Sequence, residues 1–103
     1  MNVRFTTAAK MDLQEIGDYI AKDNPRRALS FVAELQQKSL ELAASPRAFP
    51  LVPRYEKYGI RWRVHGNYLI FYRVNDEQIV VVHILHGAMD YAAVLFENQD
   101  NTR

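Results

Sequence analysis

The sequence predicts an α+β fold: an N-terminal strand, an antiparallel helical hairpin packed on a small, mainly antiparallel β-sheet, and a short C-terminal helix or tail. Two stretches before residue 45 have the three- and four-residue apolar spacing of helices, and the spacing changes to two after residue 59. Between them, residues 46–59 contain three of the four prolines, which predicts a surface loop. A chain of 103 residues allows one domain, which we expect over residues 1–97, with a polar and disordered tail over residues 98–103.

The first strand and the first helix follow directly from the N-terminus. Val3 and Phe5 alternate with polar neighbours, as in a half-buried strand. Thr6 or Thr7 then offers a hydroxyl that can cap a helix. We expect this helix over residues 10–22, with one apolar face made of Leu13, Ile16, Gly17 and Ile20.

The second helix has clear start and stop signals. Asn24 is a good N-cap, and Pro25 suits the first helical position because its missing N–H has no partner there. The helix should run to about Ala44, since the following Ser45-Pro46 disfavours helical geometry. The short link to the preceding helix predicts an antiparallel hairpin. The expected inner stripe is Ala28, Val32, Leu35 and Leu42, with Leu29, Ala33 and Leu40 beside it.

Three strands are expected over residues 60–65, 68–74 and 79–86, joined by a tight turn at Gly66-Asn67 and a longer turn at residues 75–78. The turn lengths give the register. The expected pairs are His65–Tyr68, Arg63–Ile70, Arg61–Tyr72, Val74–Ile79, Tyr72–Val81 and Phe71–Val82.

This register divides the strand residues between the two faces of the sheet. One face would carry Ile60, Trp62, Val64, Leu69, Phe71, Val80, Val82 and Ile84. We expect that face to pack on the helical hairpin, with Trp62 at its centre. The other face would carry Arg61, Arg63, His65, Tyr68, Ile70, Tyr72, Val74, Ile79, Val81 and Leu85.

Both faces are largely apolar, yet two helices can cover only one of them. The second face is therefore either a partner-binding surface or is covered by the C-terminal segment. One segment that could cover it is a short amphipathic helix, because the apolar residues near the C-terminus have helical spacing: Met89, Ala92, Ala93 and Phe96. The polar groups on that face, Arg61, Arg63, His65 and Tyr72, fit either a solvated strand or a phosphate-handling site.

Composition excludes several classes of protein. The net charge of +1 argues against a strongly basic nucleic-acid binder, although residues 47–63 are locally basic. The absence of cysteine removes disulfides and thiolate chemistry, and no apolar run reaches the roughly 18–20 residues of a membrane span. We therefore expect a cytoplasmic protein that has no membrane contact.

Nothing in the sequence points to a metal or a cofactor. His83 and His86 are three residues apart on one strand, so they should point to opposite faces and cannot ligate a metal together. The four glycines are dispersed, so no phosphate-binding loop is present.

The order of elements and three short motifs resemble the ParE/RelE superfamily of bacterial toxins, in particular its ParE branch. The motifs are Gly59-Ile60-Arg61, the strand segment Asn67-Tyr68-Leu69-Ile70-Phe71-Tyr72-Arg73-Val74, and His86-Gly87-Ala88-Met89-Asp90. The segment Asp23-Asn24-Pro25-Arg26-Arg27-Ala28 also looks like the ParE branch. The resemblance covers nearly the whole chain, from Val3 to about Asp90.

The resemblance implies the toxin of a type II toxin–antitoxin pair, which inhibits DNA gyrase without being an enzyme and is neutralised by a ParD-like antitoxin. It also implies that operator DNA is contacted only through the antitoxin, in an assembly that can be of higher order. The alternative is a RelE-like endoribonuclease that cuts messenger RNA on the ribosome, and a third class is a non-toxic relative. Leu69 and Met89 stand where cleaving members tend to have basic residues, and neither can bind phosphate or transfer a proton. Tyr91 lies near the position of a C-terminal tyrosine that cleaving members often use.

Two sets of residues are expected to make contacts. The gyrase-binding candidates are Arg61, Arg63, Tyr72, Arg73, His86 and Asp90. The antitoxin-binding candidates are Leu13, Ile16, Tyr19 and Ile20. We expect a disordered antitoxin tail to fold against this second set.

Overall fold

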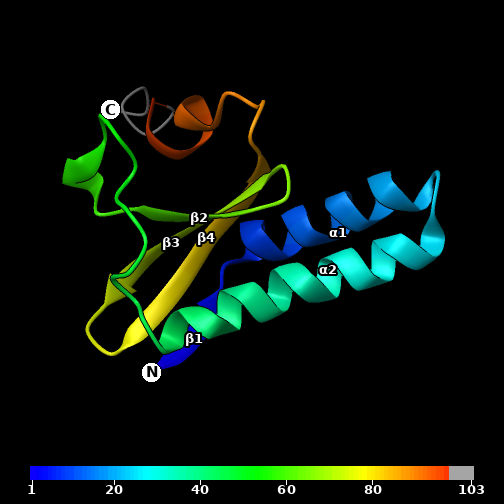
Figure 1. The fold of residues 1–103 in the computed structure, drawn as a ribbon. Coiled ribbons are helices and arrows are strands. Elements are labelled where there is room, and N and C mark those ends of the chain that lie inside the picture. The colour runs from blue at the N-terminus through cyan, green and yellow to red at the C-terminus, as the bar shows by residue number, and fades with distance from the viewer. Residues whose placement is uncertain (98–103) are drawn as a thin grey trace.

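The computed structural model describes residues 1–97 and confirms the α+β class. An N-terminal strand and a helical hairpin are followed by three further strands and a short C-terminal helical segment (Figure 1). The strands are β1 (Asn2–Phe5), β2 (Arg61–His65), β3 (Tyr68–Asn75) and β4 (Gln78–His86), and the helices are α1 (Thr7–Ala21) and α2 (Pro25–Leu40). The short helical segments are η1 (Glu41–Ala43), η2 (Glu56–Tyr58) and η3 (Ala93–Glu97). The predicted tail, residues 98–103, lies outside the described residues.

The two predicted helices are confirmed, with their caps. The Thr6 hydroxyl accepts a hydrogen bond from the Ala9 N–H at 3.0 Å, and the Asn24 side chain accepts one from the Arg27 N–H at 3.0 Å. Both bonds satisfy donors that a helix N-terminus leaves free. Gly17 allows the helices to approach closely, since a Cβ atom there would lie 3.3 Å from Val32 Cγ2. None of the helices in residues 1–97 has the length and apolar character needed to cross a membrane.

The sheet has the strand order β1-β4-β3-β2, in which β1 runs parallel to β4 and the other pairs are antiparallel. The register of the tight hairpin is as predicted: Arg61 pairs with Tyr72, Arg63 with Ile70 and His65 with Tyr68. The Val74–Ile79 and Tyr72–Val81 pairs are also confirmed.

The predicted Phe71–Val82 pair is wrong because β4 contains a bulge. Phe71 pairs with His83 while Tyr72 pairs with Val81, so Val82 is an extra residue on β4. An extra residue reverses the alternation beyond it. Ile84 therefore lies with Ile70 on one face, and Leu85 lies with Leu69 on the other, opposite to the prediction for both.

The helical hairpin packs on the face that the sequence analysis left uncovered. Ile70, Tyr72 and Val81 belong to one buried cluster with Leu13 and Leu35 of the helices. The expectation that the Trp62 face packs on the hairpin is therefore wrong. Because both faces are apolar, the alternation within each strand could not decide which one the helices cover.

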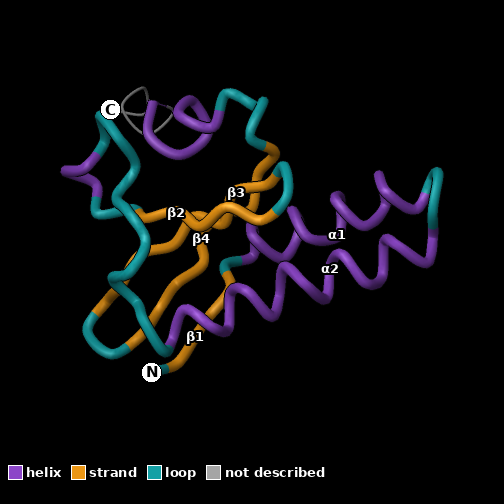
Figure 2. Tube along the Cα trace, viewed as in Figure 1, coloured by secondary structure: helices purple, strands orange, loops and turns teal. Residues whose placement is uncertain are grey.

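The opposite face of the sheet is covered by the loop before β2 and by the C-terminal segment (Figure 2). Phe71 and Phe96 are fully buried there, and Phe96 stacks on Tyr55 with ring centroids 4.3 Å apart. Trp62 is only partly buried, against Phe71 and Tyr91, so it does not form the centre of the core. Both alternatives expected for the face with Arg61 and Tyr72, a partner-binding surface or coverage by the C-terminal segment, are wrong, because the hairpin covers that face and the C-terminal segment covers the opposite one.

Candidate functional site

Arg61 and Arg63 hold the chain that follows α2 against the edge of the sheet. Arg61 Nη1 donates a hydrogen bond to the Phe49 carbonyl oxygen at 2.7 Å. Arg63 Nη1 donates to the Lys38 carbonyl oxygen at 3.0 Å and pairs with Glu41 at 3.1 Å, while its guanidinium lies 4.9 Å from the Phe49 ring. Only 18% of the Arg63 side chain is exposed. Both guanidinium groups are thus engaged within the fold.

Tyr72 lies in the core beneath the same segment. Its side chain is fully buried, and its hydroxyl donates a hydrogen bond to the Pro46 carbonyl oxygen at 2.8 Å. Burial raises the pKa of the phenol, and the nearby Arg61 only partly opposes this shift. The face with Arg61, Arg63 and Tyr72 is therefore neither the solvated strand face nor the open phosphate-handling site that the sequence analysis considered, because α2 and the following loop cover it.

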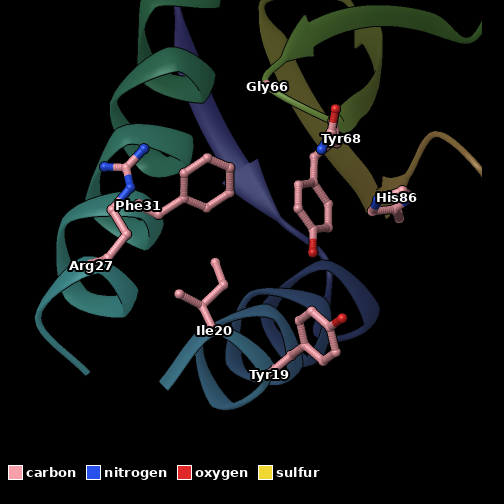
Figure 3. Close-up of a pocket in the computed structure, with 8 residues that line it drawn as sticks. Tyr19, Ile20, Arg27, Phe31, Gly66, Tyr68 and His86 are labelled. Carbon is pink, nitrogen blue, oxygen red and sulfur yellow. The ribbon is translucent and has the colours of Figure 1, made fainter. Parts of the chain in front are cut away.

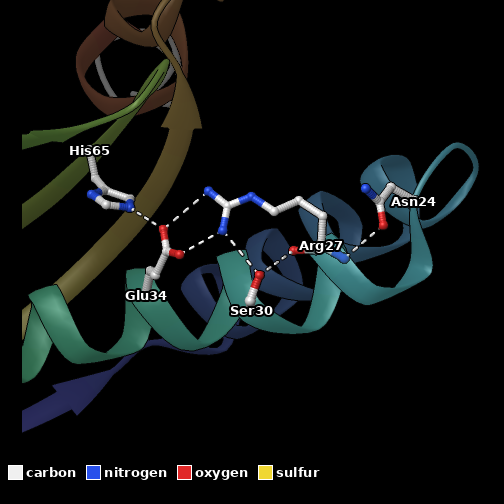
Figure 4. A network of polar contacts seen from close by, with 5 residues as sticks. All are labelled: Asn24, Arg27, Ser30, Glu34 and His65. Carbon is white, nitrogen blue, oxygen red and sulfur yellow. Dashed lines mark hydrogen bonds and ion pairs between the residues drawn. The ribbon is translucent and has the colours of Figure 1, made fainter.

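A polar network ties α2 to β2 (Figure 4). Arg27 binds both carboxylate oxygens of Glu34, at 2.6 and 3.3 Å, and also donates to the Ser30 hydroxyl. The other end of the network is His65, whose Nε2 lies 2.9 Å from Glu34 Oε1. The hydrogen bonds from Arg27 and then His65 lower the pKa of Glu34 to about 2. His65 is thus held in an ion-pair network, with its ring stacked on Phe31.

The turn after β4 presents His86 and Asp90 at the surface. The Ala88 N–H donates to His86 Nδ1 at 3.0 Å, and the Met89 N–H donates to the His86 carbonyl oxygen at 3.0 Å. Asp90 Oδ1 accepts a hydrogen bond from the Ala93 N–H at 3.3 Å, at the start of the C-terminal helical segment. Local hydrogen bonds therefore fix the shape of this turn while both side chains remain accessible.

Arg73 lies on the sheet face away from the helices. It pairs with Val80 on β4, and Val80 pairs in turn with Arg4 on β1, so the two arginines flank one fully buried valine. Neither arginine forms an ion pair with a carboxylate of residues 1–96. Arg4 and Arg73 thus place two positive charges close together on one end of the sheet.

The four antitoxin-binding candidates fall into two groups. Leu13 and Ile16 are buried, with 7% and 6% of their surfaces exposed. Tyr19 is 68% exposed, and together with Ile20 it lines a cavity of about 670 Å³ between the helical hairpin and the β2–β3 turn (Figure 3). We call this cavity the Tyr68 pocket. Its lining residues are Tyr19, Ile20, Arg27, Phe31, Gly66, Asn67, Tyr68 and His86.

The structure thus brings together residues that were expected to serve different partners. His86, a gyrase-binding candidate, lines the same pocket as Tyr19 and Ile20. Arg61, Arg63 and Tyr72 do not line it, and neither does Arg73. One ligand in the Tyr68 pocket could therefore cover His86 as well as the exposed part of α1.

Sequence reasoning missed Phe31 and Tyr68 as parts of this pocket. Phe31 has a recognisable signal, because Ala28, Phe31 and Leu35 follow the spacing of one helical face, and all three are buried. The predicted stripe contained Val32 instead, which is only partly buried. The position of Tyr68 over the hairpin depends on which sheet face the helices cover, and no local signal gives that.

A second concave surface runs between the helices on the side away from the sheet. This groove of about 600 Å³ is lined by apolar residues that include Leu13, Gly17, Leu29 and Val32. Leu29 is one of the most exposed large apolar residues of the described chain. A contiguous exposed apolar surface of this kind is typical of a partner-binding site.

The remaining histidine has a structural partner. His83 Nδ1 lies 2.7 Å from Asp12 Oδ2, and the same oxygen accepts the Ile84 N–H at 2.9 Å. Asp12 therefore joins α1 to the part of β4 that extends beyond β1. Among the described residues, no group of three or more metal-ligating side chains lies close enough to hold an ion.

Comparisons with known proteins find a matching family and solved structures with a similar fold. The family model described as the ParE toxin of the type II toxin-antitoxin system, parDE, matches residues 3–91. The solved structure of a chromosomal ParDE TA system from P. aeruginosa has a TM-score of 0.72 at 22% identity, covering 84% of this chain and 95% of that one. The toxin-antitoxin complex RelBE2 from Mycobacterium tuberculosis has a TM-score of 0.62 at 27% identity, covering 85% of this chain and 92% of that one. A search of curated proteins finds no match.

Proposed function

This chain belongs to the ParE toxin family of type II toxin–antitoxin systems, and from that premise we propose that it acts by binding DNA gyrase, stabilising the state in which the DNA is cleaved. It would thereby block replication without catalysing a reaction itself. The proposed place of action is the cytoplasm, where gyrase and the chromosome are found.

The observation that carries this proposal is that three of the groups that could move a proton are held by partners within the fold. His65 is bound to Glu34, His83 is bound to Asp12, and the Tyr72 hydroxyl is buried against Pro46. An acid–base catalyst must reach the reacting atoms of its substrate. Leu69, at the position where RelE-like members tend to have arginine, is buried. These placements favour a binding protein over a RelE-like ribonuclease.

The accessible members of the predicted gyrase-binding set are Arg73, His86 and Asp90. Arg73 lies on the sheet face opposite the hairpin, and His86 and Asp90 lie in the turn after β4, where their functional groups can reach a partner. Arg61, Arg63 and Tyr72 support the same surface indirectly, because they fix the loop that leads into β2. We propose direct contact for the first three residues and a positioning role for the others.

The proposed antagonist is a ParD-like antitoxin that binds the hairpin. The two solved structures with a similar fold are a ParDE system and the toxin-antitoxin complex RelBE2, which supports a partner of this kind. The exposed surface of α1 around Tyr19 and Ile20, the Tyr68 pocket and the groove beside Leu13 give such a partner several apolar areas on the hairpin. Ile16 contributes from beneath this area as part of the core. Operator DNA would then be contacted only through the antitoxin, with higher-order assembly following from antitoxin association.

Purified protein tests the proposal in two parallel assays. In the first, DNA supercoiling by gyrase is measured with increasing protein, and cleaved DNA is trapped with detergent. In the second, messenger RNA on ribosomes is analysed for cuts. The proposal expects loss of supercoiling, accumulation of cleaved DNA and intact messenger RNA. Cutting of ribosome-bound RNA that is lost in His65→Ala or Tyr72→Phe protein would overturn it in favour of the ribonuclease.

A further inference from the structure

A second cavity lies beside the Tyr68 pocket. The second cavity has a volume of about 300 Å³ and lies between α1 and the end of β4. The two cavities share Tyr19, Tyr68 and His86 as common walls. Two neighbouring cavities on either side of these three side chains suit a stretch of polypeptide that places a side chain in each of them. This arrangement is less suitable for a single small molecule.

Hydrogen-bond donors surround the Tyr68 pocket, and no carboxylate lines it. The Tyr68 hydroxyl points toward α1 between Ile20 and Tyr19 (Figure 3), and within residues 1–97 no group accepts its hydrogen. Because His86 Nδ1 accepts the Ala88 N–H, the neutral imidazole carries its proton on Nε2, which is also a donor. These donors favour a ligand that presents hydrogen-bond acceptors to the pocket.

Arg27, which is paired with Glu34, gives the pocket a charged hydrogen-bond donor. Its guanidinium lies 5.0 Å from the Phe31 ring, and its Nη atoms are bound to Glu34 and Ser30. This leaves Nε–H without a partner among the described residues, while 46% of the side chain is exposed. The contacts hold Arg27 in a fixed orientation, so little side-chain entropy is lost when it binds another acceptor.

The floor of the pocket is apolar. Phe31 and Ile20 point into it from the two helices, and Tyr68 covers it from β3 (Figure 3). Its volume of about 670 Å³ accommodates more than one aliphatic or aromatic side chain. Asp12 and Glu15 line the second cavity, so an acidic group of a ligand would be placed in the Tyr68 pocket, near Arg27.

We propose that the Tyr68 pocket binds an internal segment of the antitoxin in which an apolar side chain enters between Phe31 and Tyr68 while an adjacent acidic side chain binds Arg27. The identity of the occupant rests on the antitoxin partnership proposed above. The acceptor chemistry rests on the pocket itself. An internal segment, and not a chain end, is the expected occupant because the second cavity offers a place for the residues that follow.

Two capped synthetic tetrapeptides test the chemistry without requiring the antitoxin. One has two leucines between two glutamates, and the matched peptide has glutamines in place of the glutamates. Each is titrated into ¹⁵N-labelled protein, and amide shifts of Gly66, Asn67 and Tyr68 report binding. The expected result is tighter binding of the acidic peptide by roughly five- to tenfold, the effect of one charge-assisted hydrogen bond at an accessible site.

The variants isolate the role of Arg27. Arg27→Gln should abolish the preference for the acidic peptide. The single variant also leaves Glu34 without its cation, so the double variant Arg27→Gln with Glu34→Gln removes both charges, and it should abolish the preference as well. Arg26→Gln removes an exposed neighbouring charge that does not line the pocket, and it should retain the preference. Tyr68→Phe should weaken binding of the acidic peptide while the ring still packs against the leucines.

The outcomes separate this proposal from the proposed function. Equal affinity for the two peptides, or a preference that survives Arg27→Gln, overturns the acidic-segment assignment, whatever the gyrase assay shows. Shifts confined to the groove beside Leu29 would place the peptide elsewhere and overturn it equally. The expected preference with no gyrase inhibition would leave the pocket assignment standing and overturn the gyrase proposal alone.

Discussion

The Tyr72 hydroxyl, 2.8 Å from the Pro46 carbonyl oxygen, shows how a polar group can be removed from chemistry by the fold. Within the strand sequence, Tyr72 has the same alternation as Arg61 and Arg63, and this places all three correctly on one face. What covers that face is set by residues 38–49, which lie far away in sequence. The face of each residue could therefore be predicted, but not the role of its functional group.

Tyr72→Phe should lower the free energy of unfolding by about 1 kcal/mol, because it removes one intramolecular hydrogen bond and leaves the Pro46 carbonyl unpaired. Chemical denaturation of the two proteins measures the difference. Tyr19→Phe, at an exposed position, is the matched control and should change little. A Tyr72→Phe protein with unchanged stability but abolished toxicity would contradict the structural role and indicate a functional one.

Glu34 should make stability depend on pH in the acid range. Its pKa falls to about 2 in the folded state from an ordinary value of 4.5, so its contribution is fully present above about pH 4.5 and is lost as the pH falls toward 2. Glu34→Gln should therefore flatten the decline of the urea midpoint between pH 4.5 and 2. The effect should be small because the pair is solvent-exposed. Glu15→Gln, on the exposed side of α1, is the control and should retain the steeper decline of the parent protein. Identical profiles for all three proteins would contradict the assignment of this pH dependence to Glu34.

At the scale of elements, local signals predicted the helices and hairpins well. Asn24 and Pro25 gave the start of α2, and Gly66-Asn67 gave the register of the β2–β3 hairpin. The parallel pairing of β1 with β4 and the bulge at Val82 depend on distant contacts, so no local pattern predicted them. The Thr6 hydroxyl donates to the Val82 carbonyl oxygen at 2.8 Å, which satisfies an acceptor at the bulge from the start of α1.

The C-terminal segment should stabilise the sheet face that lacks the hairpin. Phe96→Ala removes a side chain with 1% of its surface exposed and should cost about 3 kcal/mol of stability. Trp62 is the single tryptophan and contacts Tyr91, so its fluorescence should shift to longer wavelength if the segment undocks. Val94→Ala, a smaller truncation in the same segment, should have a smaller effect. An unchanged denaturation midpoint and emission spectrum would show that the segment does not cover this face in solution.

At the scale of the whole molecule, the fold leaves two accessible regions around a tightly bonded centre. One is the surface of the hairpin with the Tyr68 pocket, and the other is the side opposite the hairpin, which carries Arg73 and the turn after β4. His86 adjoins both, because it lines the pocket and begins that turn. Sequence reasoning found Tyr19, Ile20 and His86 but could not bring them together, since their proximity depends on the hairpin covering the Tyr68 side of the sheet.

Single substitutions at Arg73 and in the turn after β4 should weaken gyrase inhibition without abolishing folding. Arg73→Ala, His86→Ala and Asp90→Ala each remove one accessible contact, which typically costs about 1–3 kcal/mol. The concentration for half-inhibition of supercoiling should therefore rise about ten- to hundredfold. Arg26→Ala, an exposed arginine on the hairpin, is the matched control. Equal inhibition by all four variants would place the gyrase contact elsewhere on the molecule.

The dependence of inhibition on gyrase concentration tests most directly whether the protein acts as a binder. Supercoiling is titrated with purified protein at several fixed concentrations of gyrase, after incubation long enough to reach equilibrium. A stoichiometric inhibitor requires protein in proportion to gyrase, so the amount for half-inhibition should rise linearly with gyrase concentration while ribosome-bound messenger RNA stays intact. If gyrase is unaffected at every ratio while trace protein cuts messenger RNA with many turnovers, the protein is an enzyme and the binding role is contradicted.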